Sequence, residues 1–246
     1  MRIMMHVSYD GTNYNGWQSQ PDGNTIQDKI NLALSKVCNE PIVVTGAGRT
    51  DAGVHAKDMV FHFDTQRNID QWKWVRGVNS YLPADIRIQS AQLVDQSFHS
   101  RYHSKIKTYR YIIDLEGNDP FTRLYAFSCY YQLDVDAMEK ASSVFVGTHD
   151  FTSFNSSDPS MNPVRTVNSI TFTRQGKLLM IDFKGPGFLR YMVRMMAGCL
   201  IEVGKHRLSA SDIQEIMDAK EKGACRYKAC ANGLTLLSID YDENIL

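Results

Sequence analysis

Alternating apolar and polar residues mark the first expected elements of this chain. Near the N-terminus, Ile3, Met5, Val7 and Tyr9 recur at every second position. Because successive side chains of a strand point to opposite faces, this pattern predicts a strand with one buried face. Similar alternation or short apolar runs predict further strands around residues 42–44, 59–63, 86–94, 109–113, 164–172, 178–183 and 234–236.

Apolar residues at helical spacing predict helices between these strands. Residues 26–37 repeat apolar side chains three and four positions apart, and Thr25 with Asp28 is typical of a helix N-terminus. The strongest pattern covers 188–203, where a stripe of methionine and aromatic residues predicts a helix packed in the core. Two more helices are expected at 134–145 and 213–217.

Together, these strands and helices predict an α+β fold. Many of the strands have one apolar face, which is typical of antiparallel sheets and differs from the continuous apolar runs of parallel ones. We expect two similar α/β halves, residues 1–96 and 97–246, that share a long, mostly antiparallel mixed sheet with helices on one face. No linker rich in Pro, Gly or Ser separates the halves, so a cleft is expected where they meet.

The composition is that of an ordinary globular protein, with 246 residues, 43% hydrophobic and 22% charged. Disordered and collagen-like classes are therefore excluded. The most apolar stretch, 188–203, contains Arg190 and Arg194, which argues against a membrane span. The N-terminus lacks the pattern of a secretory signal, and the five cysteines are scattered without a C-x-x-C pair. We expect a cytoplasmic protein without structural zinc.

Two basic stretches stand out in a chain whose net charge is zero. Residues 97–110 contain four basic residues and no acidic one, interleaved with aromatic side chains. Residues 184–207 contain five basic residues and one acidic one. Cations that meet phosphates beside rings that stack on unpaired bases suit a nucleic-acid surface. Solvated faces balanced by acids elsewhere fit the same counts, so charge alone leaves both interpretations open.

A glycine-rich segment carries the most distinctive candidate chemistry. Residues 45–56 read TGAGRTDAGVHA, in which glycines surround Arg49, Thr50 and Asp51. Glycine permits backbone conformations that other residues avoid, so a tight loop of specific shape is expected. A phosphate-binding loop and a plain hairpin turn both fit this pattern, although it matches neither G-x-G-x-x-G nor a P-loop.

The string GAGRTDAGVHA resembles the catalytic segment of the tRNA pseudouridine synthase A (TruA) family. The similarity continues through the chain in the same order and with similar spacing. This resemblance implies the pseudouridine synthase fold, with a positively charged cleft. The other matching segments are YDGTNYNGWQSQ (9–20), LPADI (82–86), FHSR (98–101), KTYRY (107–111), GTHDFTSF (147–154), GPGFLRYMVR (185–194) and NGLTL (232–236).

The resemblance implies an isomerase that breaks the N1–C1′ bond of uridine and rejoins the base through C5. This exchange has no net redox change or group donor, so neither a cofactor nor a metal is expected. By motif match, Asp51 is the catalytic carboxylate, Arg194 the cation that offsets its charge, and Tyr109 the ring that stacks on the uracil. Asp51 would either attack covalently or abstract a ribose proton, and the sequence does not choose. A surface ion pair for Arg194 and sheet packing for Tyr109 remain as simpler interpretations.

The resemblance also implies how RNA would bind. The target base must leave its stack, and Arg49 matches the arginine that occupies the vacated space in the family. The expected partner is the anticodon stem-loop of tRNA, bound by a homodimer. The remaining expected RNA contacts are Arg101, Lys105, Lys107, Arg110, Arg190, Lys205 and Arg207.

Lys57 and Asp58 depart from the family pattern, where a Gly-Gln pair is more usual, and this puts the substrate range in doubt. Three alternatives remain. The first is an RNA-binding protein on the same scaffold without catalysis, and the second is the same isomerase acting on other RNA uridines. The third is a glycoside-type hydrolase, which normally needs a second carboxylate, and no partner for Asp51 is evident in the sequence.

Overall fold

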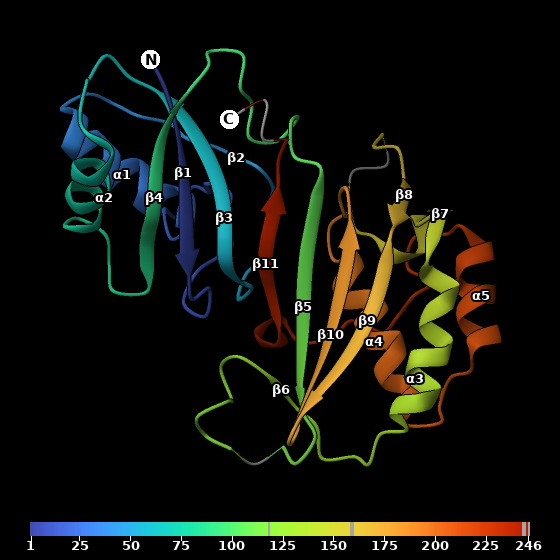
Figure 1. Cartoon of the computed structure of the whole chain (residues 1–246). Coiled ribbons are helices and arrows are strands. Elements are labelled where there is room, and N and C mark those ends of the chain that lie inside the picture. The colour runs from blue at the N-terminus through green and yellow to red at the C-terminus, as the bar shows by residue number, and fades with distance from the viewer. Residues whose placement is uncertain (118, 158–159, 243–244, 246) are drawn as a thin grey trace. The chain divides into compact units, whose positions relative to one another are not determined.

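The structure of the protein is a computed structural model (Figure 1), which describes residues 1–117, 119–157, 160–242 and 245. The chain divides into two compact units. Unit 1 comprises Met1–Lys107 and Leu236–Leu246, and unit 2 comprises Thr108–Thr235. The chain leaves unit 1 within β5 (Ile106–Asp114) and returns to it within β11 (Leu234–Asp240).

Unit 1 is built on strands in the order β4-β1-β3-β11, and β2 pairs with β3. The pairs that β1 forms with β3 and β4 are antiparallel, and Met5 lies opposite both Phe61 and Ala91. The side chains of Met5 and Phe61 are fully buried, which stabilises the fold by about 1.5–3 kcal/mol each. Helices α1 and α2 pack against each other, and α2 also packs against β4. The other elements of unit 1 are β1 (Arg2–Tyr9), α1 (Ile26–Cys38), β2 (Thr45–Gly46), β3 (His55–Asp64), α2 (Gln71–Asn79) and β4 (Ile86–Val94).

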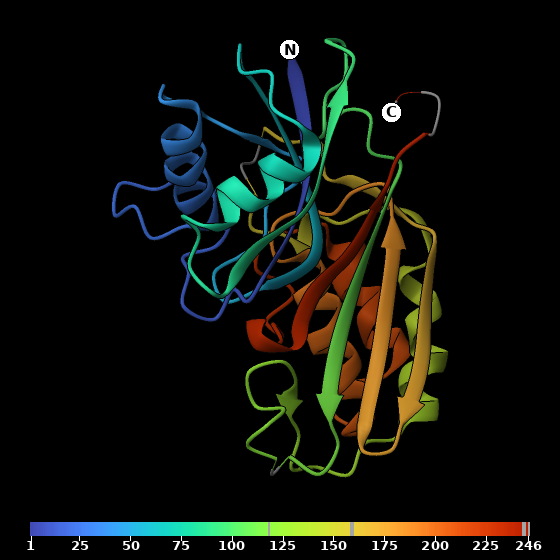
Figure 2. The same ribbon diagram turned by 60° about the vertical axis from the view of Figure 1, so that its left-hand side comes forward.

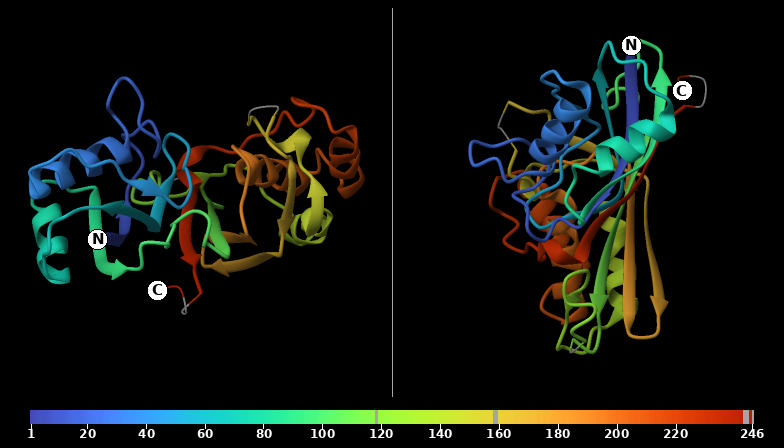
Figure 3. Two further views of the ribbon diagram at one scale, coloured as in Figure 1. Left: turned by 90° about the horizontal axis from the view of Figure 1, so that it is seen from above. Right: turned by 90° about the vertical axis from the view of Figure 1, so that its left-hand side faces the viewer.

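Unit 2 is a layer of strands covered by helices. Its strands follow the order β5-β10-β9, with β6 parallel to β5 and a separate antiparallel pair β7-β8. Figures 2 and 3 show α3, α4 and α5 on one face of the β5-β10-β9 strands. The elements of this unit are β6 (Phe127–Ser128), α3 (Val135–Ser142), η1 (Ser143–Phe145), β7 (Gly147–Asp150), η2 (Thr152–Phe154), β8 (Val164–Val167), β9 (Ser169–Gln175), β10 (Leu178–Gly185), α4 (Met192–Gly204), α5 (Ala210–Ala219) and η3 (Ala231–Gly233).

The α+β class and the mostly antiparallel strand pairing predicted from the sequence are confirmed. The predicted start of α1 is also confirmed, because the Thr25 side chain accepts a hydrogen bond from the Asp28 N–H. The helix expected at 188–203 begins four residues later, at Met192. Tyr191 has a φ of 64°, and this left-handed conformation cannot continue a right-handed helix.

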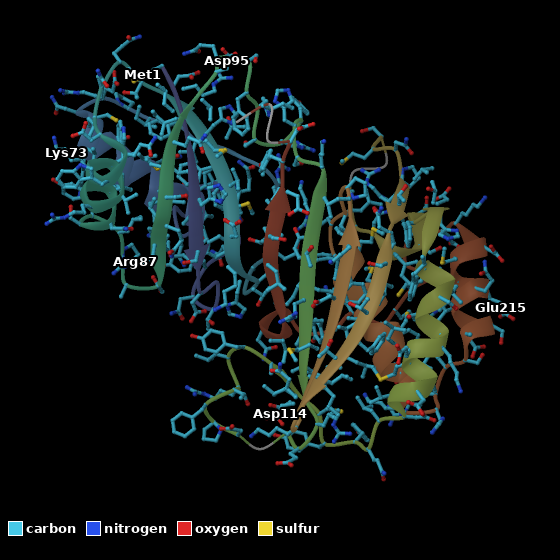
Figure 4. The ribbon with its side chains drawn as sticks, viewed as in Figure 1. Met1, Lys73, Arg87, Asp95, Asp114 and Glu215 are labelled. Atoms are coloured by element: carbon cyan, nitrogen blue, oxygen red, sulfur yellow. The ribbon has the colours of Figure 1, made fainter. Side chains whose placement is uncertain are left out.

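Asp114, labelled in Figure 4, is a buried carboxylate at the end of β5. It accepts hydrogen bonds from the Thr122 hydroxyl and from the N–H groups of Glu116 and Gly117. Burial alone would raise the pKa of this carboxyl, but the hydrogen bonds and the nearby Lys177 hold the pKa below its ordinary value. Asp114 therefore acts as a structural anchor for the turn that follows β5.

None of the helices in the described part of the chain is long and apolar enough to cross a bilayer.

Candidate functional site

The segment that carries Asp51 is a loop between the short strand β2 and the long strand β3. The Ala47 N–H donates to the Val60 carbonyl at 2.8 Å, which ties the start of the loop to β3. The Val54 N–H donates to the Asp51 carbonyl at 3.1 Å and closes a turn. Gly53 within this turn has a φ of 76°, a conformation that suits glycine. The glycine-rich sequence thus forms a tight loop with specific backbone hydrogen bonds.

The segment that follows β1 packs directly on this loop. The Trp17 N–H donates to the Thr50 carbonyl at 3.1 Å, and the Gly53 N–H donates to the Tyr14 carbonyl at 3.2 Å. Gly16 has a φ of 87°, and a Cβ atom there would lie only 2.6 Å from the Thr50 carbonyl oxygen. The two sequence motifs at 9–20 and 46–56 therefore form one structural unit, and glycine at position 16 is needed for their close contact.

Thr50 is more deeply buried than its two neighbours. Its hydroxyl shares a 2.8 Å hydrogen bond with the Tyr9 hydroxyl, and Thr50 is buried. Arg49 is exposed and Asp51 is half-buried. The hydrogen bonds of the Thr50 hydroxyl and carbonyl fix the backbone between Arg49 and Asp51.

Lys107 lies beneath the same loop, inside unit 1. It is 9% exposed, and its Nζ donates to the Ala47 carbonyl at 2.7 Å. Burial, with a smaller effect of the Arg101 charge, lowers the pKa of Lys107 to about 8. The sequence pattern places Lys107 among the RNA contacts, but the structure encloses its ammonium within the protein.

In unit 2, Arg194 projects from the first turns of α4 and is held by a neighbouring segment. Its Nε donates to the Ala229 carbonyl at 2.9 Å, and the Ala229 N–H donates to the Arg194 carbonyl at 2.9 Å. A Cβ atom at Gly198 would lie 2.8 Å from the Tyr227 carbonyl oxygen, so glycine allows this segment to approach the helix. The bond from Nε fixes the plane of the guanidinium group.

Three cations surround the ring of Tyr191, which precedes α4. The charged groups of Arg190, Arg194 and Lys228 lie 4.9, 5.3 and 4.3 Å from the ring centroid. Such contacts place positive charge over the negative face of the ring. The sequence did not indicate this cluster of cations around Tyr191, because Lys228 is distant in sequence and reaches the ring only in the folded chain.

Tyr109 and Tyr111 lie on the same face of β5 but differ in their surroundings. Tyr111 is fully buried, and its hydroxyl donates to the Cys230 carbonyl at 3.0 Å. Tyr109 is 8% exposed, and its ring meets that of Phe188 nearly at right angles, with centroids 5.4 Å apart. Tyr111 is therefore a core residue, and Tyr109 packs edge-to-face beside the turn that precedes α4.

The other predicted RNA contacts fall into two groups. Among the described residues, no acidic side chain pairs with Arg49, Arg101 or Arg190, and all three are exposed. The remaining four each have an acidic partner, which sequence counts of charge do not reveal. These pairs are Lys105–Asp242 at 2.6 Å, Arg110–Asp182 at 2.7 Å, Lys205–Glu202 at 2.9 Å and Arg207–Glu202 at 3.5 Å.

The predicted residues are distributed over both units. Arg49, Asp51, Arg101, Lys105 and Lys107 lie in unit 1. The remaining predicted residues lie in unit 2: Tyr109, Arg110, Arg190, Arg194, Lys205 and Arg207.

Within the part of the chain that the structure describes, no group of three or more His, Cys, Asp or Glu residues is arranged to hold a metal ion.

Comparison with known proteins shows that this chain is similar to one family over most of its length. A family model described as tRNA pseudouridine synthase matches residues 5–103 and 141–242. Proteins named tRNA pseudouridine synthase A from Exiguobacterium sp. and Brevibacillus brevis are 40% and 42% identical over 98% of this chain, and the alignments cover 98% and 99% of those proteins. The protein of that name from Limosilactobacillus reuteri is 40% identical over 99% of this chain and 98% of its own length.

A likeness to a solved structure is much weaker. A chain of a Cbf5-Nop10-Gar1 complex is 14% identical, with a TM-score of 0.33, over 81% of this chain and 45% of that chain. This likeness is too weak to support a conclusion. The family model and the sequence relatives are sufficient without it.

Proposed function

The chain belongs to the tRNA pseudouridine synthase family, and from this membership we propose that it isomerises uridine to pseudouridine in tRNA. In this reaction the bond between uracil N1 and ribose C1′ breaks, and a bond between C5 and C1′ forms. C5 loses a proton and N1 gains one, so the reaction is balanced without a co-reactant. The observation that carries the proposal is the match of the family model to residues 5–103 and 141–242, which includes the Asp51 loop.

We propose Asp51 as the catalytic carboxylate. Its support is the loop itself, which is fixed by hydrogen bonds to Trp17 and Tyr14 and leaves Asp51 half-buried. A group held by a rigid backbone needs little reorganisation to reach its reactive geometry. Covalent attack on C1′ and abstraction of a ribose proton both require the ionised form, so both routes fit this proposal.

Arg194 and Tyr109 are the proposed partners of Asp51 in the reaction. A guanidinium group can stabilise a carboxylate that is withdrawn from water, and the Ala229 carbonyl fixes the orientation of Arg194. Tyr109 offers a ring for stacking on the uracil, at a strength of about 1–3 kcal/mol for such contacts. These roles rest on the motif match and on the local geometry of each residue.

RNA binding is proposed to depend first on Arg49, Arg101 and Arg190. These exposed arginines can meet phosphates without giving up an acidic partner in the described chain. Arg49 is the proposed residue that fills the space of the flipped base. Lys228, beside Tyr191, adds a further candidate for a phosphate contact. The anticodon stem-loop as target, the homodimer and the cytoplasmic location are proposals that rest on the family resemblance.

The test uses unmodified tRNA labelled with tritium at C5 of uridine. The wild-type protein should release tritium without releasing free uracil, which is the signature of isomerisation. Free uracil would support the hydrolase instead, and binding without tritium release would support a scaffold that only binds RNA. Mapping of pseudouridine in tRNA from a deletion strain would show whether the modified uridines lie in the anticodon stem-loop.

The matched variant for this assay is Asp51→Asn. We expect the rate at saturating enzyme to fall by at least about 10³-fold, because both routes lose the charged group. The dissociation constant for tRNA should stay within about twofold, since phosphate contacts supply most of the affinity. Normal turnover by Asp51→Asn would exclude Asp51 as the catalytic residue.

A further inference from the structure

Lys107 is an unusual lysine because its charged end is buried in unit 1. The residue is 9% exposed, and no carboxylate of the described chain lies within ion-pair distance of its Nζ. Among the described residues, its Nζ donates a hydrogen bond to the Ala47 carbonyl alone, at 2.7 Å. Burying an ammonium group without a counter-ion is costly, so this arrangement calls for a role that offsets the cost.

Ala47 is the residue on which the start of the Asp51 loop depends. It is fully buried, and its N–H donates to Val60 on β3 while its carbonyl accepts from Lys107. Gly48 comes next, and a Cβ atom there would lie 3.5 Å from the Lys107 Nζ. The ammonium group therefore lies directly under the backbone that leads into Arg49 and Asp51.

The two ends of the loop are held by different parts of unit 1. Trp17 and Tyr14 hold the end at 50–53 through backbone hydrogen bonds. At the other end, the Ala47 carbonyl would lose its recorded donor if Lys107 were removed. A buried carbonyl without a donor drives the backbone to move until it finds one. The position of Arg49 and Asp51 would change with it.

We propose that Lys107 is a positioning residue, which holds the Ala47 carbonyl and so fixes the loop that presents Arg49 and Asp51. This inference rests on the proposed function of Asp51. It replaces the sequence-based interpretation of Lys107 as a phosphate contact, because the buried ammonium points into the loop backbone. The two roles predict different changes on substitution.

The first test compares Lys107→Met with Lys36→Met, which replaces an exposed lysine of α1. If Lys107 positions the loop, the single-turnover rate at saturating enzyme falls about 10- to 100-fold, as expected for a small misplacement of a catalytic group. Most of the affinity for tRNA is then kept, because Arg101 and Arg190 lie outside the loop, so the fall in the saturating rate exceeds the rise in the dissociation constant. A phosphate contact predicts the reverse, with an unchanged saturating rate, weaker binding and a salt slope reduced by about one. That second pattern would overturn the proposal.

Rescue separates the hydrogen bond from general loss of structure. Lys107→Ala leaves room for n-propylammonium, which should restore part of the rate in a saturable way. Tetramethylammonium carries the charge but has no N–H, so it should not restore the rate. Lys107→Gln keeps an N–H donor and should be faster than Lys107→Met, and this pair carries the test if Lys107→Ala does not fold. Equal rates for Lys107→Gln and Lys107→Met would count against the hydrogen bond.

A readout independent of activity completes the experiment. Hydrogen exchange of a peptide covering residues 45–54 should be faster in Lys107→Met than in the wild type, and unchanged in Lys36→Met. If the wild type releases no tritium, the proposed function fails, and the exchange result still decides whether Lys107 holds the loop. If the wild type is active and Lys107→Met matches it in rate and exchange, the inference alone fails.

Discussion

The Asp51 loop of unit 1 and the start of α4 in unit 2 hold their proposed catalytic side chains in different ways. In the loop, the backbone is fixed by hydrogen bonds to Trp17 and Tyr14. On α4, the side chain of Arg194 itself is fixed by its bond to the Ala229 carbonyl. Asp is short and takes its position from the backbone, whereas the long side chain of Arg retains rotamer freedom unless a bond of its own removes it.

After Asp51→Asn, the largest effect is predicted for Arg194, which tests the α4 side of this comparison. Arg194→Met should lower the single-turnover rate by about 10²- to 10³-fold, because the proposed counter-charge for the catalytic carboxylate is lost. A carboxylate without its cation takes up a proton more readily, so the acidic limb of the rate profile should move to higher pH. The measurement is tritium release from tRNA between pH 5 and 9.

Arg174→Met is the matched control for Arg194→Met. Arg174 also donates from Nε to a backbone carbonyl, that of Gly176 at 3.0 Å, but it lies at the end of β9 outside the proposed site. Its removal should leave both the rate and the pH profile unchanged. An unchanged pH profile in Arg194→Met would contradict the proposed role of the guanidinium.

A smaller effect is expected from adding one methyl group to each region. Gly16→Ala would place Cβ 2.6 Å from the Thr50 carbonyl oxygen at a φ of 87°, and we expect a loss of about 2–4 kcal/mol in the free energy of unfolding. Gly198→Ala would place Cβ 2.8 Å from the Tyr227 carbonyl oxygen and should cost about 1–3 kcal/mol. Urea unfolding of each variant gives these values.

Gly223→Ala isolates the cost of the backbone conformation. Gly223 has a φ of 88°, but nothing lies within 4 Å of its added Cβ. This variant should lose only about 1 kcal/mol. If Gly16→Ala is no less stable than Gly223→Ala, the close contact between the 9–20 segment and the loop is not the reason for glycine at position 16.

The sequence predicted the parts of the fold that depend on local pattern. Alternation placed β1, and the Thr25 cap placed the start of α1, because both signals lie within a few residues of the element. The sequence did not predict the start of α4, because no local pattern marked the left-handed conformation at Tyr191. It also gave no bounds for α2, a short helix in which the buried residues are Trp74 and Val78.

The chemistry of the candidate site was predicted less evenly. The motif identified Asp51 and its glycine-framed loop, but it could not show that Lys107 is buried beneath that loop. Charge counts treat all basic residues as equivalent. Only the fold shows that Arg110 is paired with Asp182 and that Lys228 joins Arg190 beside Tyr191. Partners distant in sequence leave no local pattern.

The smallest predicted effect is a pH-dependent loosening of the Asp51 loop. His62 on β3 is 5% exposed and shares a hydrogen bond with the Ser100 hydroxyl, which in turn donates to the Thr45 carbonyl at the start of the loop. Burial, with a further effect of the Arg2 charge, lowers the pKa of His62 from 6.5 to about 4. Between pH 6.5 and 4 the unfolded chain therefore binds a proton that the folded protein excludes.

The stabilising effect of neutral His62 should thus be complete above pH 6.5 and decrease as the pH falls toward 4. We expect the free energy of unfolding to fall by an amount on the order of 1 kcal/mol between pH 7 and 5. Over the same range, peptide 45–54 should lose more of its protection from hydrogen exchange than peptide 192–204. His62→Gln keeps a polar side chain without this titration and should flatten the pH dependence of unfolding. An equal slope in His62→Gln and the wild type would assign the acid sensitivity to another group.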